Sequence, residues 1–313
     1  MARRLLLALG GNAILPAGKS GTIVEQRRIT LETMRSLART LTPEDRVVIT
    51  HGNGPVIGNI LIRNEAAADR VPPMPIDICD ADSQGGIGYM IAQCLDAAFS
   101  REGMRRSVTV IVTRVLVDAS DPAFRNPTKP IGPFYPEAEA RRHQAERGWV
   151  VREDSGRGWR RVVPSPRPKG ILEVEGIRIL FEAGHVVVAA GGGGVPVALS
   201  EEGEPVGVEA VVDKDRASAL LASALGIESF VLVTAVSHVA LRFGKPDQKD
   251  LDRMTAGEAR RYKDAGEFGV GSMLPKMESA IDFLASGGKD VLVTSPENLA
   301  AAILGRSGTR IVP

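Results

Sequence analysis

The sequence is short of net charge, cysteine, aromatic residues and long apolar runs, and most of these shortages exclude a class of protein. Among 313 residues, 39 Lys and Arg balance 38 Asp and Glu, which leaves no global basic field to attract nucleic acid. Cys79 and Cys94 are the only cysteines, so a disulfide scaffold is excluded and a cytoplasmic location is favoured. No apolar run approaches the roughly 18 residues of a membrane-spanning helix, so no membrane partner is predicted. The four histidines lack metal-ligand spacing, so no metal held by side chains is predicted.

Glycine, in contrast, is abundant and clustered, with 34 residues in the chain. Each of four clusters follows an expected strand or precedes an expected helix: Gly10-Gly11, Gly52-Asn53-Gly54, Gly191–Gly194 and Gly271-Ser272-Met273. Ligands of open α/β sheets bind beyond the carboxyl ends of the strands. Backbone N–H groups at glycine turns and helix N-termini favour phosphate there. The clusters therefore predict a phosphate site at one edge of a sheet.

Apolar runs without polar alternation take turns with amphipathic segments along most of the chain. The runs predict strands at 5–9, 46–50, 107–117, 185–190, 229–235 and 290–294. The amphipathic segments predict helices at 22–41, 55–68, 83–99, 214–225, 275–285 and 296–304. Strands buried on both faces and joined by helices form parallel sheets. We therefore expect one α/β domain over residues 1–313, a three-layer αβα sandwich with an open, mainly parallel central sheet.

Residues 118–170 interrupt this alternation. They include eight of the 20 prolines, both tryptophans and eleven Lys or Arg, and their net charge is positive while that of the remainder is negative. A helix over 137–147 is predicted, with a hairpin that pairs 149–152 with 158–163 and turns at 154–156. We expect an inserted subdomain that protrudes from the sheet. Its composition fits a solvated basic loop as well as a lid that brings cations to an anionic ligand.

The familiar phosphate-binding motifs fit poorly. G-x-G-x-x-G is absent because Gly58 comes one residue too late after Gly52-Asn53-Gly54, which disfavours a dinucleotide-binding oxidoreductase. A loose Walker-like run, Ala13-x4-Gly18-Lys19-Ser20, follows a strand that Gly10-Gly11 has already ended. We interpret it as a surface loop, because a P-loop joins its strand directly to its helix.

Three lysines are candidates for phosphoryl transfer, which needs cations over the transferring group and a scaffold that aligns donor and acceptor. Lys129 precedes a proline in the insertion, Lys214 lies between Asp213 and Asp215 at an expected helix start, and Lys276 follows the fourth glycine cluster. A neighbouring acid can orient such an ammonium group. A single lysine of this kind is more often a surface charge, so the hypothesis depends on their acting together.

Several motifs together resemble those of the carbamate kinases, in the amino acid kinase superfamily. The similarity runs nearly end to end. Two stretches of the insertion, N-P-T-K-P-I-G at 126–132 and G-W-R-R-V-V-P-S-P at 158–166, are particular to the carbamate kinases. Glycine-rich turns are shared across the superfamily. The further matching stretches are L-G-G-N-A at 9–13, H-G-N-G-P at 51–55, S-Q-G at 83–85, D-K-D at 213–215 and G-S-M-L-P-K at 271–276.

The resemblance implies reversible phosphoryl transfer between ATP and carbamate, with Mg²⁺ accompanying ATP or ADP. It also implies a homodimer, and a reaction that proceeds toward ATP in arginine breakdown. It implies catalytic roles for Lys129, Lys214 and Lys276, with Asp215 orienting the lysines. Donors around the phosphoryl group and carbamate would come from Gly10, Gly11, Asn12, Gly52, Asn53 and Gly54. The nucleotide would be bordered by Ala235, Val236, Ser237, Val239, Lys245, Met273 and Pro275. No general base is implied, because the carbamate oxygen is already anionic.

Two stretches depart from the pattern of this family. Cys79-Asp80-Ala81-Asp82 places acids where small or apolar residues are usual, in an expected loop near the site or the dimer surface. Ser237-His238-Val239-Ala240 stands where an acid and an aromatic residue commonly follow the strand, and it bears on nucleotide affinity. Two alternatives therefore stay open: another kinase of the superfamily that phosphorylates a different carboxylate or phosphate, and a non-catalytic nucleotide-binding regulator.

Overall fold

The computed structural model of the chain describes residues 2–15, 21–154, 158–269 and 271–313, apart from the side chains of Asn12 and Pro55. The Walker-like run at 13–20 and the hairpin turn at 154–156 lie largely outside the described residues. Among the described helices, none combines the length and the apolar character needed to cross a bilayer.

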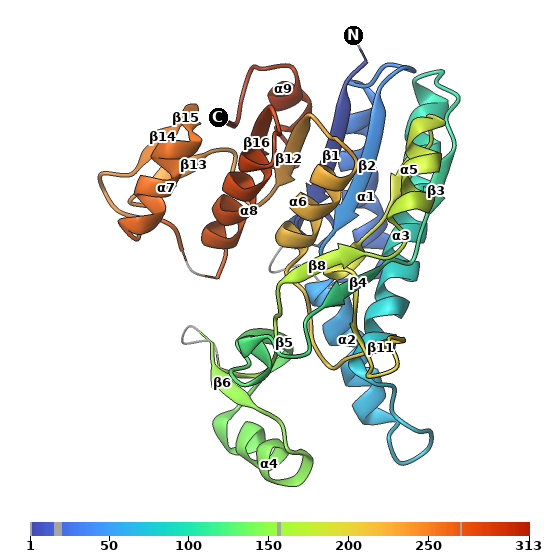
Figure 1. Ribbon diagram of the computed structural model, residues 1–313, viewed down its shortest axis with the longest axis vertical. Coiled ribbons are helices and arrows are strands. Elements are labelled where there is room, and N and C mark those ends of the chain that lie inside the picture. The colour runs from blue at the N-terminus through green and yellow to red at the C-terminus, as the bar shows by residue number, and fades with distance from the viewer. Residues whose placement is uncertain (1, 16–20, 155–157, 270) are drawn as a thin grey trace.

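The largest sheet is mainly parallel, as the sequence predicts. Its spatial order is β15-β17-β16-β12-β1-β2-β9-β3, and every neighbouring pair is parallel except β16 with β17. The strands in that order are Arg253–Thr255, Thr309–Val312, Asp290–Thr294, Ser229–Val233, Arg4–Leu9, Arg46–His51, Val186–Val188 and Val108–Val110. The parallel strands β1, β2, β9 and β12 therefore direct their carboxyl ends to one edge of the sheet (Figure 1).

Helices cover both faces of this sheet, which makes the three layers. One face packs on α1 (Ile23–Ala38), α3 (Ile76–Arg101) and α9 (Leu299–Ile303). The other face packs on α5 (Val174–Glu182), α6 (Lys214–Ala224), α7 (Ala256–Asp264) and α8 (Met273–Ala285). Two separate hydrophobic cores result, because successive residues of a strand point to opposite faces.

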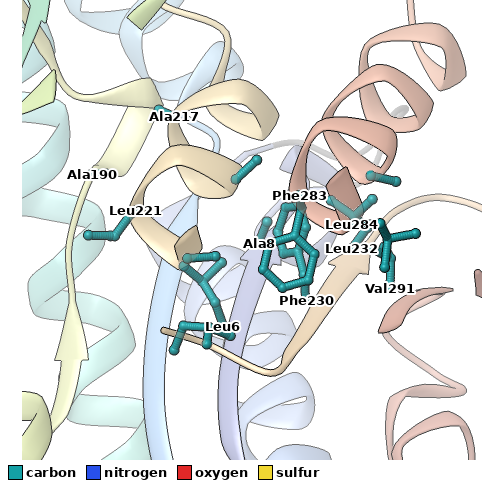
Figure 2. Close-up of a cluster of buried hydrophobic side chains, with 14 of the residues drawn as sticks. Leu6, Ala8, Ala190, Ala217, Leu221, Phe230, Leu232, Phe283, Leu284 and Val291 are labelled. Atoms are coloured by element: carbon teal, nitrogen blue, oxygen red, sulfur yellow. The ribbon is translucent and has the colours of Figure 1, made fainter. Parts of the chain in front are cut away.

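Strand β1 shows this alternation residue by residue. Leu5, Leu7 and Leu9 belong to the core under α1 and α3, whereas Leu6 and Ala8 belong to the core under α6 and α8. Figure 2 shows Leu6 and Ala8 in the second core, with the rings of Phe230 and Phe283. Burial on both faces of the sheet therefore explains this run of five apolar residues.

The predicted elements are present, with three differences. The apolar run 107–117 is two strands in different sheets, β3 and β4 (Arg114–Val117), because the chain leaves the main sheet after Val110. Helix α3 begins at Ile76, so residues 79–82 are helical and not a loop as expected. Helix α9 is shorter than the predicted 296–304.

A second, smaller sheet marks where the insertion leaves and returns. Its order is β11-β10-β4-β8, formed by Pro205–Gly207, Val195–Leu199, Arg114–Val117 and Pro168–Ile171. Because β4 and β8 pair with each other, residues 118–167 start and end side by side. We call this segment the excursion. Helix α2 (Gly54–Ala66) packs against it, and the short strands β13 (Val239–Leu241) and β14 (Lys249–Leu251) pair elsewhere, near the C-terminal half.

The excursion has its own sheet and its own small core. Strands β5 (Lys129–Tyr135), β7 (Trp159–Val163) and β6 (Val151–Glu153) pair antiparallel, and α4 (Glu137–Arg147) packs on them. The predicted helix and hairpin are thereby confirmed. Figure 1 shows α4 and β6 well away from the main sheet. The core of this part is small, consisting of Tyr135, Ala140 and Val151 with Trp149 and Trp159 against them.

Candidate active site

A cleft of about 850 Å³ lies between the edge of the main sheet and the excursion. Its floor comes from the turns that follow three parallel strands: Gly11 after β1, Gly52 after β2 and Gly192 after β9. The excursion supplies Lys129 at the start of β5. The glycine clusters and the carboxyl ends of the strands therefore meet at one place, as the sequence predicts.

The N-termini of three helices border this cleft. Helix α2 begins at Gly54, α6 begins at Lys214, and α8 presents Pro275 and Lys276 in its first turn. The first N–H groups of a helix have no acceptor within the helix, and they carry the positive end of the helix dipole. The ends of α2 and α8 lack side-chain caps, so they favour an anion such as phosphate, whereas the end of α6 is capped by Asp213.

Lys214, Asp215 and Lys276 form one buried charged group at the junction of α6 and α8. Lys276 Nζ donates to Asp215 Oδ2 at 3.0 Å, and Lys214 Nζ donates to Asp215 Oδ1. The side chain of Lys214 is only 14% exposed and that of Lys276 only 11%. Burial favours neutral forms and lowers the pKa of Lys214, although Asp215 opposes this. Burial would raise the pKa of Asp215, but the charges of Lys214 and Lys276 outweigh it and lower that pKa.

Lys129 reaches across the cleft from the excursion to Asp213. Its Nζ lies 3.0 Å from Asp213 Oδ2, and its side chain is 36% exposed. The other oxygen of Asp213 caps α6 by accepting from the backbone N–H groups of Asp215 and Arg216 at 3.0 and 3.4 Å. Burial would raise the pKa of Asp213, but the charge and hydrogen bond of Lys129 bring it well below the usual range for an aspartate.

The predicted glycines have unlike roles in the structure. The N–H of Gly10 donates to Val233 O and that of Gly52 to Leu9 O, both at 2.8 Å, so these amides are used within the sheet. A Cβ on Gly52 would lie 3.2 Å from Lys214 Cδ, so its lack of a side chain lets the lysine stem pass. Gly11 and Gly54 line the cleft, and the side chain of Asn12 is outside the described part of the chain.

Below the cleft floor lies a layer of buried polar side chains. Asn53 lines the cleft, yet its Nδ2 points away and donates to Asp80 Oδ1 and Ser83 Oγ at 2.5 and 2.8 Å. His51 is buried, which lowers its pKa to about 4 and keeps it neutral at physiological pH. Burial raises the pKa of Asp80 to about 8. Asp80, which departs from the family pattern, therefore contacts Asn53, one of the predicted site residues.

The residues predicted to border the nucleotide are only partly gathered at the cleft. Pro275 lines it, and Met273 begins the same helix. Residues 235–237 lie in the loop after β12, where Ser237 Oγ is 3.1 Å from His238 Nδ1. Val239 is buried and its N–H donates to Thr309 Oγ1, whereas Lys245 is exposed on a loop beyond β13. Their role in nucleotide binding stays a prediction.

Sequence reasoning missed Arg160 and the full role of Asp213. The Arg160 guanidinium faces the cleft, where it donates to Gly132 O at 2.9 Å and pairs with Asp154 at 3.2 Å. Its signal was the Arg160-Arg161 pair of G-W-R-R, which lies on β7, the strand that pairs with β5 of Lys129. The signal for Asp213 was an aspartate immediately before a helix, which is a common N-cap.

The charge of the cleft suits an anionic ligand such as a phosphate ester. Five cationic side chains and three carboxylates line it, for a net charge of +2. Within the described ranges, no group of three or more His, Cys, Asp or Glu is arranged to hold a metal ion. The two carboxylates nearest the lysines, Asp213 and Asp215, are already paired with them.

The chain is similar to known proteins of one family. The model of the amino acid kinase family matches residues 3–295. A carbamate kinase of Pyrococcus furiosus is 45% identical over 315 residues and covers 100% of both chains. The carbamate kinase-like protein YahI of Escherichia coli is 43% identical, covering 100% of this chain and 99% of its own. The structure of Giardia lamblia carbamate kinase bound to AMP-PNP has a TM-score of 0.92 at 39% identity, covering 99% of this chain and 98% of its own.

The chain therefore belongs to the amino acid kinase family. Within that family it groups with the carbamate kinases, and membership of this group makes it a phosphotransferase.

Proposed function

We propose that the protein transfers a phosphoryl group reversibly between ATP and carbamate. The observation that carries this proposal is the Lys214–Asp215–Lys276 group, which lies where three helix N-termini meet at one cleft. Relatives named carbamate kinase, similar over the whole chain, support the choice of substrate. The excursion supplies the opposing cation, Lys129, from the N-P-T-K-P-I-G stretch.

The chemistry asks little of the protein beyond charge and alignment. In the direction of ATP synthesis, an oxygen of the ADP β-phosphate forms a bond to the phosphorus of carbamoyl phosphate. The bond from that phosphorus to the carbamoyl oxygen breaks, and its electron pair leaves with carbamate. Lys214 and Lys276 stabilise the negative charge on the transferring oxygens, and the N-termini of α2 and α8, which lack side-chain caps, add backbone donors. Asp215 holds both ammonium groups in place before substrate binds.

We further propose that Mg²⁺ enters with the nucleotide. The cleft lacks an arrangement of three acidic or histidine ligands among its described residues, and Mg²⁺ in nucleotide sites is commonly held by phosphates and water with one or two carboxylates. Asp213 and Asp215 are the carboxylates within the cleft that fit this part. The ion would offset charge on the phosphates, while the lysines keep their positions through their own ion pairs.

The physiological setting is also a proposal. We propose a cytoplasmic homodimer that works toward ATP in arginine breakdown, with the excursion acting as a lid over the cleft. Two observations support this role of the excursion. It reaches the cleft through Lys129, and it is joined to the body where strands β4 and β8 pair. Sedimentation of the purified protein tests the dimer directly, and a monomer at micromolar concentration would contradict it.

The activity is tested by supplying ADP, magnesium and carbamoyl phosphate and measuring ATP through hexokinase and glucose-6-phosphate dehydrogenase. We expect ATP at a rate proportional to enzyme, well above the spontaneous decay of carbamoyl phosphate. The matched control is the full-length Lys276→Ala variant, which lacks one cation of the cleft. No ATP from the parent above the spontaneous decay would rule out this function, whereas equal ATP from both proteins would remove only Lys276 from the catalytic role.

A further inference from the structure

The carboxyl group of Asp80 is wholly buried beneath the floor of the cleft. Asp80 on α3 is 0% exposed, and its Oδ1 accepts from Asn53 Nδ2 at 2.5 Å. Its Oδ2 is buried without a hydrogen-bond partner among the described residues. A buried carboxylate with one oxygen unpartnered is costly, so the neutral acid is favoured.

Asp80 is connected to the cleft through two neighbours. Asn53, which lines the cleft, donates Nδ2 to both Asp80 Oδ1 and Ser83 Oγ, and Ser83 Oγ donates back to Asp80 O at 2.7 Å. Gly192 covers the pair from the cleft side with φ +69°. A Cβ there would lie 2.4 Å from Asn53 Nδ2 and 2.6 Å from Asp80 Oδ1. The acid is therefore separated from the cleft by one glycine turn and one amide.

We propose that Asp80 is a positioning residue of the phosphoryl-transfer site, which holds the Asn53 amide turned away from the cleft and, while protonated, keeps the floor beneath the transferred anion uncharged. This inference rests on the proposed function. Asp80 touches neither substrate nor nucleotide; it acts through Asn53 and the Gly192 turn. The unpartnered Oδ2 carries the proton, because Oδ1 is the acceptor for Asn53.

The surroundings of Asp80 favour the proton. Burial is the main cause that raises its pKa to about 8; Asp77 on the same helix adds to it, and the hydrogen bonds from Asn53 and Ser83 oppose it. The thiol of Cys79 has a raised pKa and is neutral. The turn over Asp80 consists of glycines without ionisable side chains, and His51 at the end of β2 is neutral because its pKa is about 4. Among the groups named, none is a cation that would hold the carboxylate form.

The sign of the pH effect follows from the direction of this shift. The folded protein binds the proton more tightly than the unfolded chain, so folding is favoured less as pH rises from about 4 to about 8. Above that range Asp80 is ionised in both states, and a negative charge lies under a site that binds anions. We therefore expect catalytic efficiency to fall as pH rises through about 8.

The test compares Asp80→Asn, Asp80→Ala and the control Asp82→Asn, an exposed acid two residues along the same helix. Asn keeps the shape and the acceptor but cannot ionise, so kcat/KM should stay within about threefold of the parent at pH 6.5 and lose the alkaline fall. Ala removes the tether of Asn53 and should lower kcat/KM by about tenfold to hundredfold at every pH. Asp82→Asn should follow the parent profile. An unchanged alkaline fall in Asp80→Asn, or full activity of Asp80→Ala, would overturn the proposal.

Thermal unfolding separates this inference from the proposed function. The Tm of Asp80→Asn relative to the parent should rise as pH is raised from about 5 to 9, because only the parent develops a buried charge. The infrared band of a protonated carboxylic acid should be present in the parent at pH 6 and absent from Asp80→Asn. A parent that makes no ATP while the Tm difference appears contradicts the function alone. An active parent with a Tm difference independent of pH contradicts the role of Asp80.

Discussion

The main sheet and the excursion both bring cations to the cleft, but they hold them differently. Lys214 and Lys276 are 14% and 11% exposed and share the carboxylate of Asp215. Lys129 is 36% exposed and depends on a single ion pair with Asp213, 84 residues away in the chain. The body therefore fixes its cations before substrate arrives, whereas the excursion holds its cation by a contact open to water.

The packing of the two regions shows the same contrast. The body has two extensive cores, one on each face of an eight-stranded sheet. The excursion has a core of three buried residues and is joined to the body by a third small cluster that includes Ile57, Ile131 and Val163. Regions with few buried apolar contacts open at lower free energy than a large core. One side of the cleft is therefore built on large cores and the other on a small one, and we expect the excursion to open locally before the body does.

The largest effect should come from the core of the body. Phe230 is wholly buried, and its ring meets that of Phe283 at 5.5 Å between centroids (Figure 2). Phe230→Ala should cost about 3–5 kcal/mol of unfolding free energy, measured by denaturant titration. Val151→Ala, in the core of the excursion, is the comparison and should leave the midpoint of the main transition unchanged. Equal shifts in both variants would show that the two regions unfold as one unit.

The next largest effect concerns the fixed cations. Lys276→Ala should lower kcat by about 10²–10³-fold, the loss typical of removing one donor that stabilises a transition state. ADP binding, measured by calorimetry, should change much less, because the cation acts mainly on the transition state. Lys289→Ala is the control, since this lysine pairs with Glu228 on the surface. A variant that loses ADP affinity and retains kcat would assign Lys276 to ground-state binding instead.

A smaller loss is expected for the cation of the excursion. Lys129→Ala should lower kcat/KM by about tenfold to hundredfold, less than Lys276→Ala, because water weakens a charge that is more than a third exposed. Folding should be unaffected, as judged by circular dichroism and Tm. Lys169→Ala, an exposed lysine of β8, serves as the control. Full activity of Lys129→Ala would remove the excursion from catalysis and leave it a surface feature.

The sequence predicted the body of the fold better than the details of the site. Apolar runs such as 5–9 and 290–294 are buried on both faces, so composition alone locates them. The division of 107–117 into β3 and β4 was not predictable, because both strands are β-branched and only tertiary pairing sends them to different sheets. The meeting of the glycine turns at one edge followed from parallel pairing, which fixes the direction of every strand.

Within the site, residue types were readable and their partners were not. Lys214, Asp215 and Lys276 meet because α6 and α8 pack side by side, a contact between segments about 60 residues apart that no local pattern encodes. Gly52 was expected to donate to phosphate, yet its N–H is used by Leu9 and its missing side chain makes room for Lys214. Asp80 looked like an acid in a loop and is a buried acid in a helix. Burial and long-range contacts decide these roles, and both depend on the completed fold.

The smallest expected effect isolates one ion pair between the two regions, that of Lys129 with Asp213. Asp213→Asn keeps the N-cap of α6, because Asn caps helices about as well as Asp, and removes the charge that faces Lys129. Since Lys129 is more than a third exposed, the ion pair should contribute no more than about 1 kcal/mol to stability. Cleavage of the excursion by a protease should become faster, whereas the Tm of the body should hardly change.

High salt, but not mild acid, should reproduce this effect in the parent protein. High salt screens a partly exposed pair, so it should speed cleavage in the parent. The effect should be smaller in Asp213→Asn, which keeps, among the described residues, only the pairs Arg147–Glu65 and Arg161–Glu209 between the two regions. Because the pKa of Asp213 is lowered in the folded protein, the ion pair is fully present at any pH above the ordinary pKa of an aspartate. It is lost only as the pH falls through the lowered pKa of the folded state. Cleavage at pH 5 should therefore match that at pH 7 in the parent. If cleavage rates change with neither the substitution nor the salt, apolar packing such as that of Ile131 and Val163 holds the excursion, and the contrast between the two regions rests on packing and not on charge.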